Sequence, residues 1–361
     1  MSVTNRSTHS REPIPYRKAG SAAYSSSLSH QDHSTLAVIA TGALGLMLLW
    51  WVVPEFAWSG WAWAGIALTL GYAAIRGHEK LVRWRVLTSP PLMPERVGHP
   101  DWTWFRYTGW GGDRLPAYLL ESESKSSELV LGLHGWGSCA GRIEQRMLHM
   151  HDQGMHVLAP DMRGHGSAGL REEWTGLKML ADIELLLDSF QADAERLGVE
   201  RIHIYGHSMG GFLALRLASH QSGWWKGMVG SAILESPVTS FPLLIKIIHP
   251  GPLGRLLLPL TRKAIRNEYE RIHPDLNVRW DGAQVPDWGI PDLPVLVLQA
   301  GGDKRIGNSH LNRLTPHLPA DAVVQVLTTL DHSSVSDSPE RRELLEAFLS
   351  ERFGIGVRSD G

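Results

Sequence analysis

The sequence of 361 residues predicts an α/β fold with a doubly wound, mainly parallel sheet, preceded by a two-helix transmembrane hairpin. Two observations predict the sheet. Short apolar strands alternate with amphipathic helices after about residue 100, and residues 201–218 read as a strand, a sharp glycine turn and a helix. Two long uncharged runs near the N-terminus predict the hairpin. We therefore expect a flexible tail at 1–33, the hairpin at 34–85 and a globular domain at 86–361.

The composition of the chain argues against several classes of partner and cofactor. Hydrophobic residues make up 43% and charged residues 20% of the chain, which is typical of a globular protein. The net charge of −2 and the lack of a basic stripe interleaved with aromatic residues argue against nucleic acid as a partner. Cys139 is the single cysteine, so no intramolecular disulfide can form. Because no zinc-type Cys/His spacing occurs either, we expect no metal and no cofactor.

The N-terminal region predicts a tail followed by two membrane spans. Residues 1–33 contain many Ser, His and Arg and few large apolar side chains, which favours disorder. Residues 35–53 and 56–75 contain no charge, and each run is long enough for a hydrocarbon core of roughly 30 Å. Two buried helices of a soluble protein are the alternative interpretation of these runs. A cleaved signal peptide fits poorly because the lead is long and a second apolar run follows directly.

Basic residues flank both runs and predict the orientation. The turn between the runs carries only Glu55, and basic flanks stay in the cytoplasm. We expect a two-pass membrane protein that contacts the bilayer through residues 35–75, with the globular domain facing the cytoplasm. The basic flanking residues are Arg6, Arg11, Arg17, Lys18, Arg76, Lys80, Arg83 and Arg85.

The globular domain begins after a linker that contains Pro90, Pro91 and Pro94. Its first two strands, separated by the glycine-rich segment 109–113, are expected to form a β-hairpin. Helices are expected to end near Gln153, Leu197 and Phe353. The expected strands are residues 102–108, 114–121, 128–133, 155–160, a strand from 201, 231–235, 295–300 and 322–328.

A long gap between the strands at 231–235 and 295–300 predicts a cap at about 238–291. About sixty residues are too many for a simple crossover between parallel strands. The apolar part of this gap, residues 241–260, is interrupted by Pro250, Gly251, Pro252 and Gly254, which argues against a third membrane span.

Ser208 lies in the turn Gly206-His-Ser-Met-Gly-Gly211, between an apolar strand and an apolar helix. In a G-x-S-x-G turn the strained serine lifts its Oγ above the sheet, and small flanking residues let strand and helix backbones meet. The turn therefore predicts a nucleophile elbow. The alternative is a glycine-rich turn in which the serine caps the helix.

Together with this elbow, four further motifs resemble the α/β-hydrolase superfamily, in particular its lysophospholipase, monoacylglycerol lipase and serine aminopeptidase-like branch. The motifs follow the family's order over roughly residues 100–355, and the resemblance implies an α/β-hydrolase fold with a cap insertion. It does not extend to the N-terminal hairpin. The motifs are His134-Gly-Trp-Gly137, Asp161-Met-Arg-Gly-His-Gly166, Gly206-His-Ser-Met-Gly-Gly211, Gly301-Gly-Asp303 and Asp331-His332.

The resemblance implies a catalytic triad of Ser208, Asp303 and His332, because the family's chain order is serine, acid, histidine. Glu235 is the rival acid, since some relatives place the acid at the end of that strand. The backbone N–H groups of Trp136 and Met209 are the expected oxyanion hole.

Other residues of the motifs are expected to be structural. The Trp136 side chain can also pack against the cap. His207 is expected to pack beside the elbow, with contact to substrate as the alternative. Asp161, Arg163 and His165 are expected to hold their loop by hydrogen bonds.

The favoured hypothesis is a membrane-anchored serine hydrolase, esterase-like or lipase-like, that cleaves carboxylic esters of lipidic acyl chains through an acyl-enzyme. Two alternatives stay open. The same triad serves acyltransferases, thioesterases and amidases, and a non-catalytic α/β-hydrolase scaffold could bind a ligand at the membrane.

Overall fold

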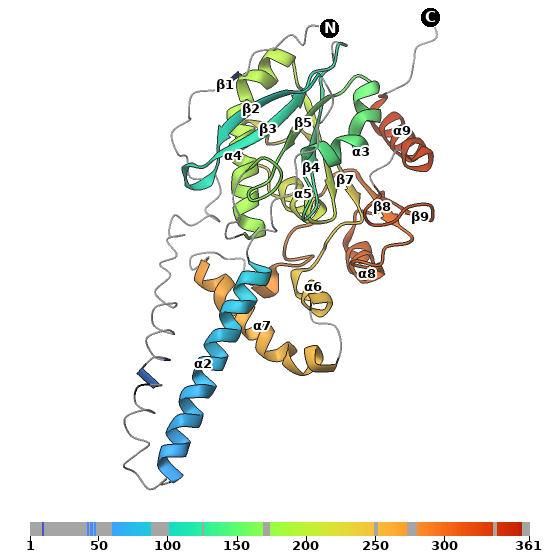
Figure 1. The fold of residues 1–361 in the computed structure, drawn as a ribbon. Coiled ribbons are helices and arrows are strands. Elements are labelled where there is room, and N and C mark those ends of the chain that lie inside the picture. Colours follow the sequence, from blue (N-terminus) through green and yellow to red (C-terminus); the bar gives the residue numbers. More distant parts are fainter. Residues whose placement is uncertain are drawn as a thin grey trace, which may run out of the picture.

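The computed structural model describes residues 9–10, 42, 44–45, 47, 60–87, 101–124, 126–168, 174–248, 252–272, 280–334 and 338–355. Its described strands form one sheet in the order β1-β2-β3-β5-β4-β6-β7-β8-β9 (Figure 1). Strands β4 to β9 pair in parallel, and β2 and β3 form an antiparallel hairpin beside β5. The strands are β1 (His9–Ser10), β2 (Thr103–Thr108), β3 (Arg114–Leu120), β4 (Glu128–Leu133), β5 (His156–Pro160), β6 (Arg201–His207), β7 (Val229–Glu235), β8 (Val295–Ala300) and β9 (Val323–Leu327).

Helices cover both faces of this sheet (Figure 1). α3 and α9 pack with one buried apolar cluster, and α4 and α5 pack with another. The central strands β4, β7 and β8 are apolar almost throughout because both of their faces are covered. The helices are α2 (Gly60–Val86), α3 (Ala140–Asp152), α4 (Gly176–Leu197), α5 (Met209–Ser219), α6 (Phe241–Ile248), α7 (Pro252–Ile272), α8 (Asn308–Leu314) and α9 (Pro339–Phe353).

The predicted doubly wound sheet is confirmed. Each strand expected between residues 102 and 328 lies within about two residues of an observed strand. These strands were predictable because apolar runs bounded by glycine, proline or charged residues are a local signal. The gap between β7 and β8 contains α6, α7 and a short 3-10 helix at Trp280–Gly282, in place of a simple crossover.

The predicted hairpin is not found. None of the helices in the described part of the chain is long and apolar enough to cross a membrane. The second uncharged run forms the first half of α2, and the helix then continues through charged residues to Val86. Tryptophan, glycine, threonine and tyrosine dilute the aliphatic residues of α2, which is why its hydropathy falls short. The first run, 35–53, lies outside the described residues except at 42, 44, 45 and 47.

α2 projects from the sheet as a long rod, and α7 crosses it near the sheet (Figure 1). The C-terminal half of α2 is docked: Val82 is buried, and Arg83 lies 3.9 Å from Glu268 of α7. The carbonyl of Leu87 accepts a hydrogen bond of 2.8 Å from the Trp174 N–H. The polar end of α2 therefore belongs to the packed structure of the cap. The N-terminal half exposes Leu68, Leu70, Tyr72 and Ile75.

Candidate active site

Ser208 lies at the junction of β6 and α5 with φ 55° and ψ −113°, in the left-handed region that non-glycine residues rarely occupy. The neighbouring glycines explain how the strain is tolerated. A Cβ on Gly210 would lie 1.9 Å from the carbonyl oxygen of Leu133, and one on Gly206 would lie 2.4 Å from that of Gly210. Only glycine permits this approach of strand and helix, so the turn has the geometry of a nucleophile elbow.

Three residues far apart in the sequence meet at this turn. Ser208 Oγ lies 2.9 Å from His332 Nε2, and His332 Nδ1 lies 2.8 Å from Asp303 Oδ2. All three side chains are buried or nearly so. The sequence-predicted serine, acid and histidine therefore form one hydrogen-bonded chain. This is the arrangement in which a histidine can take a proton from a serine while a carboxylate orients its ring.

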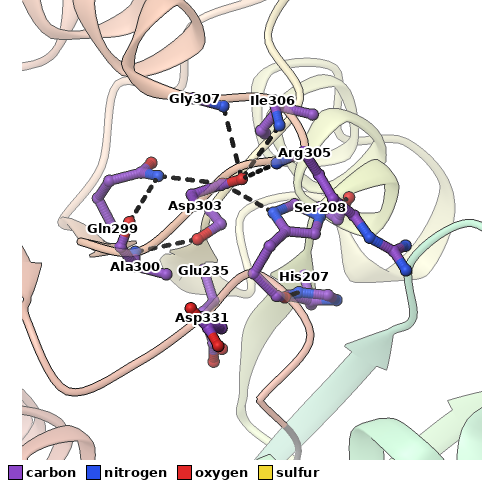
Figure 2. Close-up of polar contacts among 12 residues, drawn as sticks. His207, Ser208, Glu235, Gln299, Ala300, Asp303, Arg305, Ile306, Gly307 and Asp331 are labelled. Atoms are coloured by element: carbon purple, nitrogen blue, oxygen red, sulfur yellow. Dashed lines mark hydrogen bonds and ion pairs between the residues drawn. The ribbon is translucent and has the colours of Figure 1, made fainter.

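Asp303 lies in the loop after β8, where its carboxylate accepts several hydrogen bonds (Figure 2). Its Oδ1 accepts hydrogen bonds of 3.0 Å from the backbone N–H groups of Arg305 and Ile306. Burial alone would raise the pKa of Asp303, but the hydrogen bonds from His332 and from these amides lower the pKa to about 2. The carboxylate is thus charged and fixed in direction at neutral pH.

Glu235, the rival acid, has different partners. It lies buried at the end of β7, where Arg146 Nε is 3.0 Å from Oε1 and Arg341 Nε is 3.1 Å from Oε2. The Tyr205 hydroxyl donates to the same carboxylate. Burial alone would raise the pKa of Glu235, but the two arginines lower the pKa to about 2. Arg146 and Arg341 also donate to the carbonyl of Ser334, at 2.8 and 3.3 Å, so this group supports the loop that carries His332.

We expect Glu235→Gln to lower the free energy of unfolding by about 3–5 kcal/mol, because it leaves two buried arginines without their carboxylate. The pKa of Glu235 falls from an ordinary 4.5 to about 2 on folding. Its contribution to stability is therefore complete above about pH 4.5 and is lost as the pH falls toward 2. Urea unfolding of wild type and variant across this range checks both points. Equal stabilities at pH 7, or a difference that grows on acidification, would contradict the ion-pair account.

The loop after β4 lies against the elbow. A Cβ on Gly135 would lie 3.1 Å from the Cβ of Ser208, so the Gly135 backbone nearly touches the serine. Trp136 and Met209 line the same cavity as Ser208. Met209 is the first residue of α5, where backbone N–H groups lack partners within the helix. The Trp136 ring packs edge-on against Trp174 at 4.8 Å and against His165 at 5.4 Å, an interaction that orients the loop.

His207 has a role that the sequence did not reveal. Its Nε2 lies 2.7 Å from the carbonyl oxygen of His332, so the ring donates a hydrogen bond to the backbone of the base. Burial, together with the nearby Arg146, lowers the pKa of His207 to about 3 and keeps the ring neutral. His207 therefore positions His332. No local pattern around residue 207 could have indicated a partner 125 residues away.

The loop after β5 is held by hydrogen bonds, as predicted. Asp161 Oδ1 accepts from the Ala140 N–H at 2.7 Å, and the Arg163 guanidinium donates to Asp182 at 2.8 and 3.0 Å. His165 Nδ1 lies 2.9 Å from the Arg163 carbonyl oxygen. His134 Nε2 accepts from the Met162 N–H at 3.0 Å, which ties this loop to the one after β4.

A cavity of about 850 Å³ opens above Ser208. Part of its wall is apolar and is contributed by α6, by the 3-10 helix of the cap and by Trp174. Cys139 is buried at the start of α3 and does not line the cavity. The apolar lining includes Val86, Trp174, Phe241, Leu244, Ile245 and Trp280.

Residues 124–280 match the family model described as serine aminopeptidase, S33. The esterase Pf2001 from Pyrococcus furiosus has a similar structure, with a TM-score of 0.53 and 18% identity over 73% of this chain and 99% of that protein. The chain has the α/β-hydrolase fold, and its residues 124–280 are similar to the serine aminopeptidase, S33, family of that fold. The predicted fold is thereby confirmed, and the match over residues 124–280 supports the predicted S33 and monoglyceride lipase-like branch.

Two curated relatives are similar to part of this chain. Human monoglyceride lipase is 28% identical over 163 residues, which cover 44% of this chain and 52% of the lipase. The bifunctional esterase/perhydrolase DCH of Acinetobacter calcoaceticus is 32% identical over 134 residues, which cover 37% of this chain and 45% of that enzyme. The matched regions thus span about half the length of these relatives.

Proposed function

We propose that this α/β-hydrolase is a serine esterase whose triad is Ser208, His332 and Asp303. The observation that carries the proposal is the continuous hydrogen-bonded chain from Ser208 Oγ through His332 to Asp303, at 2.9 and 2.8 Å, beneath a cavity large enough for a small ester. The named activities of both curated relatives, an esterase/perhydrolase and a monoglyceride lipase, support ester substrates.

In the proposed reaction Ser208 Oγ attacks the ester carbonyl while His332 Nε2 accepts its proton. Asp303 keeps Nδ1 protonated and stabilises the imidazolium that forms. The tetrahedral oxyanion is held by the backbone N–H groups of Trp136 and Met209, which the backbone positions of Gly135 and of the α5 N-terminus support. His332 then gives its proton to the leaving alcohol, and a water molecule releases the acyl group by the reverse path.

Steady-state hydrolysis of p-nitrophenyl esters by wild type and by His332→Gln tests this reaction. We expect saturable release of p-nitrophenol by wild type and a large loss in the variant, because His332 is the only hydrogen-bond partner of Ser208 Oγ among the residues that the structure describes. His310→Gln serves as the control, since His310 is a buried histidine whose Nδ1 accepts from the Thr239 N–H and which does not line the cavity. Equal activity of the two variants would contradict the proposal.

We further propose that the acyl group is lipidic. The apolar part of the cavity wall supports this, because each buried CH₂ contributes about 0.8 kcal/mol of transfer free energy. Monoacylglycerols and lysophospholipids are the expected substrate class.

The acyl preference is testable with a series of esters that differ only in chain length. We expect kcat/KM to rise about fourfold for each added CH₂ until the cavity is filled, since about 0.8 kcal/mol per CH₂ corresponds to that factor. Leu244→Asp, which places a charge on the cavity wall, should flatten the rise. A flat or falling series in wild type would indicate a general esterase without lipid specificity.

Membrane attachment is also a proposal, in which residues 35–75 hold the enzyme at the bilayer with the hydrolase on the cytoplasmic side. The exposed apolar residues of the projecting half of α2 support it, and Val86 at the other end of α2 lines the cavity. In this arrangement α2 would run from the bilayer to the wall of the cavity. Membrane fractionation, followed by protease protection in sealed vesicles, tests attachment and orientation. Recovery of the protein in the soluble fraction would contradict attachment.

A further inference from the structure

The charged side chains that line the cavity above Ser208 are all positive. Among the described residues that line it, Arg142, Arg146 and Arg305 are permanently charged, and no aspartate or glutamate lines it. His207, which also lines it, is kept neutral by burial. A neutral ester offers these guanidinium groups no ionic partner, whereas an anionic group on the substrate can form charge-assisted hydrogen bonds with those that are not already paired.

The three arginines differ in their hydrogen-bond and ion-pair partners. Arg146 is paired with Glu235 and is part of the support of the His332 loop. The guanidinium groups of Arg142 and Arg305 have no hydrogen-bond or ion-pair partner within the part of the chain that the structure describes. Arg142 is half-buried in the first turn of α3, where the helix dipole adds partial positive charge. Two charges that face the cavity are therefore available to a ligand.

These arginines belong to the elements that hold His332. Arg305 follows Asp303 by two residues, and Figure 2 shows its side chain extending on the Ser208 side of Asp303. Arg142 lies one helical turn before Arg146, whose guanidinium donates to Ser334. The apolar part of the wall comes from other elements, namely the cap and the region of Trp174. The leaving-group oxygen must lie at His332 Nε2 to receive its proton, so the arginines belong to the leaving-group side.

We infer that the substrate is an ester whose leaving alcohol carries an anionic group, either phosphate or carboxylate, which Arg142 and Arg305 bind while the acyl chain occupies the apolar wall. This inference rests on the proposed esterase function. In the acylation step the bond between Ser208 Oγ and the acyl carbon forms and the bond from that carbon to the alcohol oxygen breaks. The serine proton passes through His332 to this oxygen, the anionic alcohol leaves, and water later releases the fatty acid.

The test uses hexanoyl esters of glycerol, of glycerol phosphate and of glycerate, which share one acyl group and stay monomeric in solution. We expect wild-type kcat/KM to be at least about tenfold higher for an anionic ester than for the neutral one. Arg142→Gln and Arg305→Gln should each reduce the ratio of kcat/KM for the anionic ester to kcat/KM for the neutral ester by about tenfold. This is the loss expected for one charge-assisted hydrogen bond. Comparison of the phosphate and glycerate esters assigns the anion.

Lys304→Gln is the matched control, because it removes the same charge one residue from Arg305 at an exposed position that does not line the cavity. It should leave the ratio unchanged. Equal kcat/KM for neutral and anionic esters, or a ratio that neither arginine variant changes, would overturn the inference. Hydrolysis of the neutral ester reports separately on the proposed function, so the failure of one proposal can be told from the failure of the other.

Discussion

Ser208→Ala should lower kcat/KM for ester hydrolysis by at least about 10³-fold, because it removes the atom that forms the acyl-enzyme. Binding and the oxyanion N–H groups would account for the small residual rate. KM should change little, since Ser208 is a small part of the cavity wall. Steady-state kinetics on purified wild type and variant check the prediction.

The control for this variant is Ser309→Ala, which removes an exposed hydroxyl whose Oγ donates to the Ile306 carbonyl at 3.2 Å. It should retain wild-type kcat/KM. Circular dichroism and thermal unfolding establish that both variants are folded. If Ser208→Ala kept more than about a tenth of wild-type activity, Ser208 would not be the nucleophile.

Asp303→Asn should lower kcat by about 10⁴-fold, because an amide leaves the His332 ring in the wrong tautomer and does not stabilise the imidazolium. The loss should appear at all pH values where the enzyme is folded, since the pKa of Asp303 is about 2 and the carboxylate is ionised throughout.

Glu235→Gln provides the comparison, assayed at equal folded fraction. It breaks the pairs to Arg146 and Arg341 without touching the triad, so its loss of kcat should be much smaller than that of Asp303→Asn. A larger loss of kcat in Glu235→Gln than in Asp303→Asn would make Glu235 the catalytic acid and Asp303 a structural residue.

The strands and the elbow could be predicted because their signals are local. An apolar run, a glycine-rich turn and an apolar helix around Ser208 specify the backbone within about twenty residues. The loops that carry Asp303 and His332 could be predicted for a related reason, since each directly follows a strand of a parallel sheet and such ends meet at one edge.

The roles of Glu235 and His207 could not be predicted because they depend on long-range partners. Arg146 lies 89 residues and Arg341 lies 106 residues from Glu235 in sequence, and nothing in the motif around Glu235 indicates two buried arginines. A carboxylate at the end of a strand is compatible with a catalytic acid and with an ion pair alike. Only the three-dimensional contacts separate the two interpretations.

The properties of α2 could also not be predicted from local sequence patterns alone. Counting uncharged residues predicted a span that ends at 75, but the count ignored the low hydropathy of tryptophan, tyrosine and glycine and the continuation of the helix into its charged half. Sequence could not show that this charged half packs against α7, with Val82 buried and Arg83 beside Glu268. The predicted boundary between residues 85 and 86 lies at the C-terminal end of α2, which ends at Val86.

The most direct test of the account is to treat the wild-type protein with a fluorophosphonate and to identify the modified residue by peptide mass spectrometry. These reagents form a stable bond with a serine oxygen only when a neighbouring base activates it and an oxyanion hole receives the phosphoryl oxygen. We expect a single adduct, on Ser208, that is lost in Ser208→Ala and forms far more slowly in Asp303→Asn. An adduct on another residue, or undiminished labelling of Ser208→Ala, would contradict it.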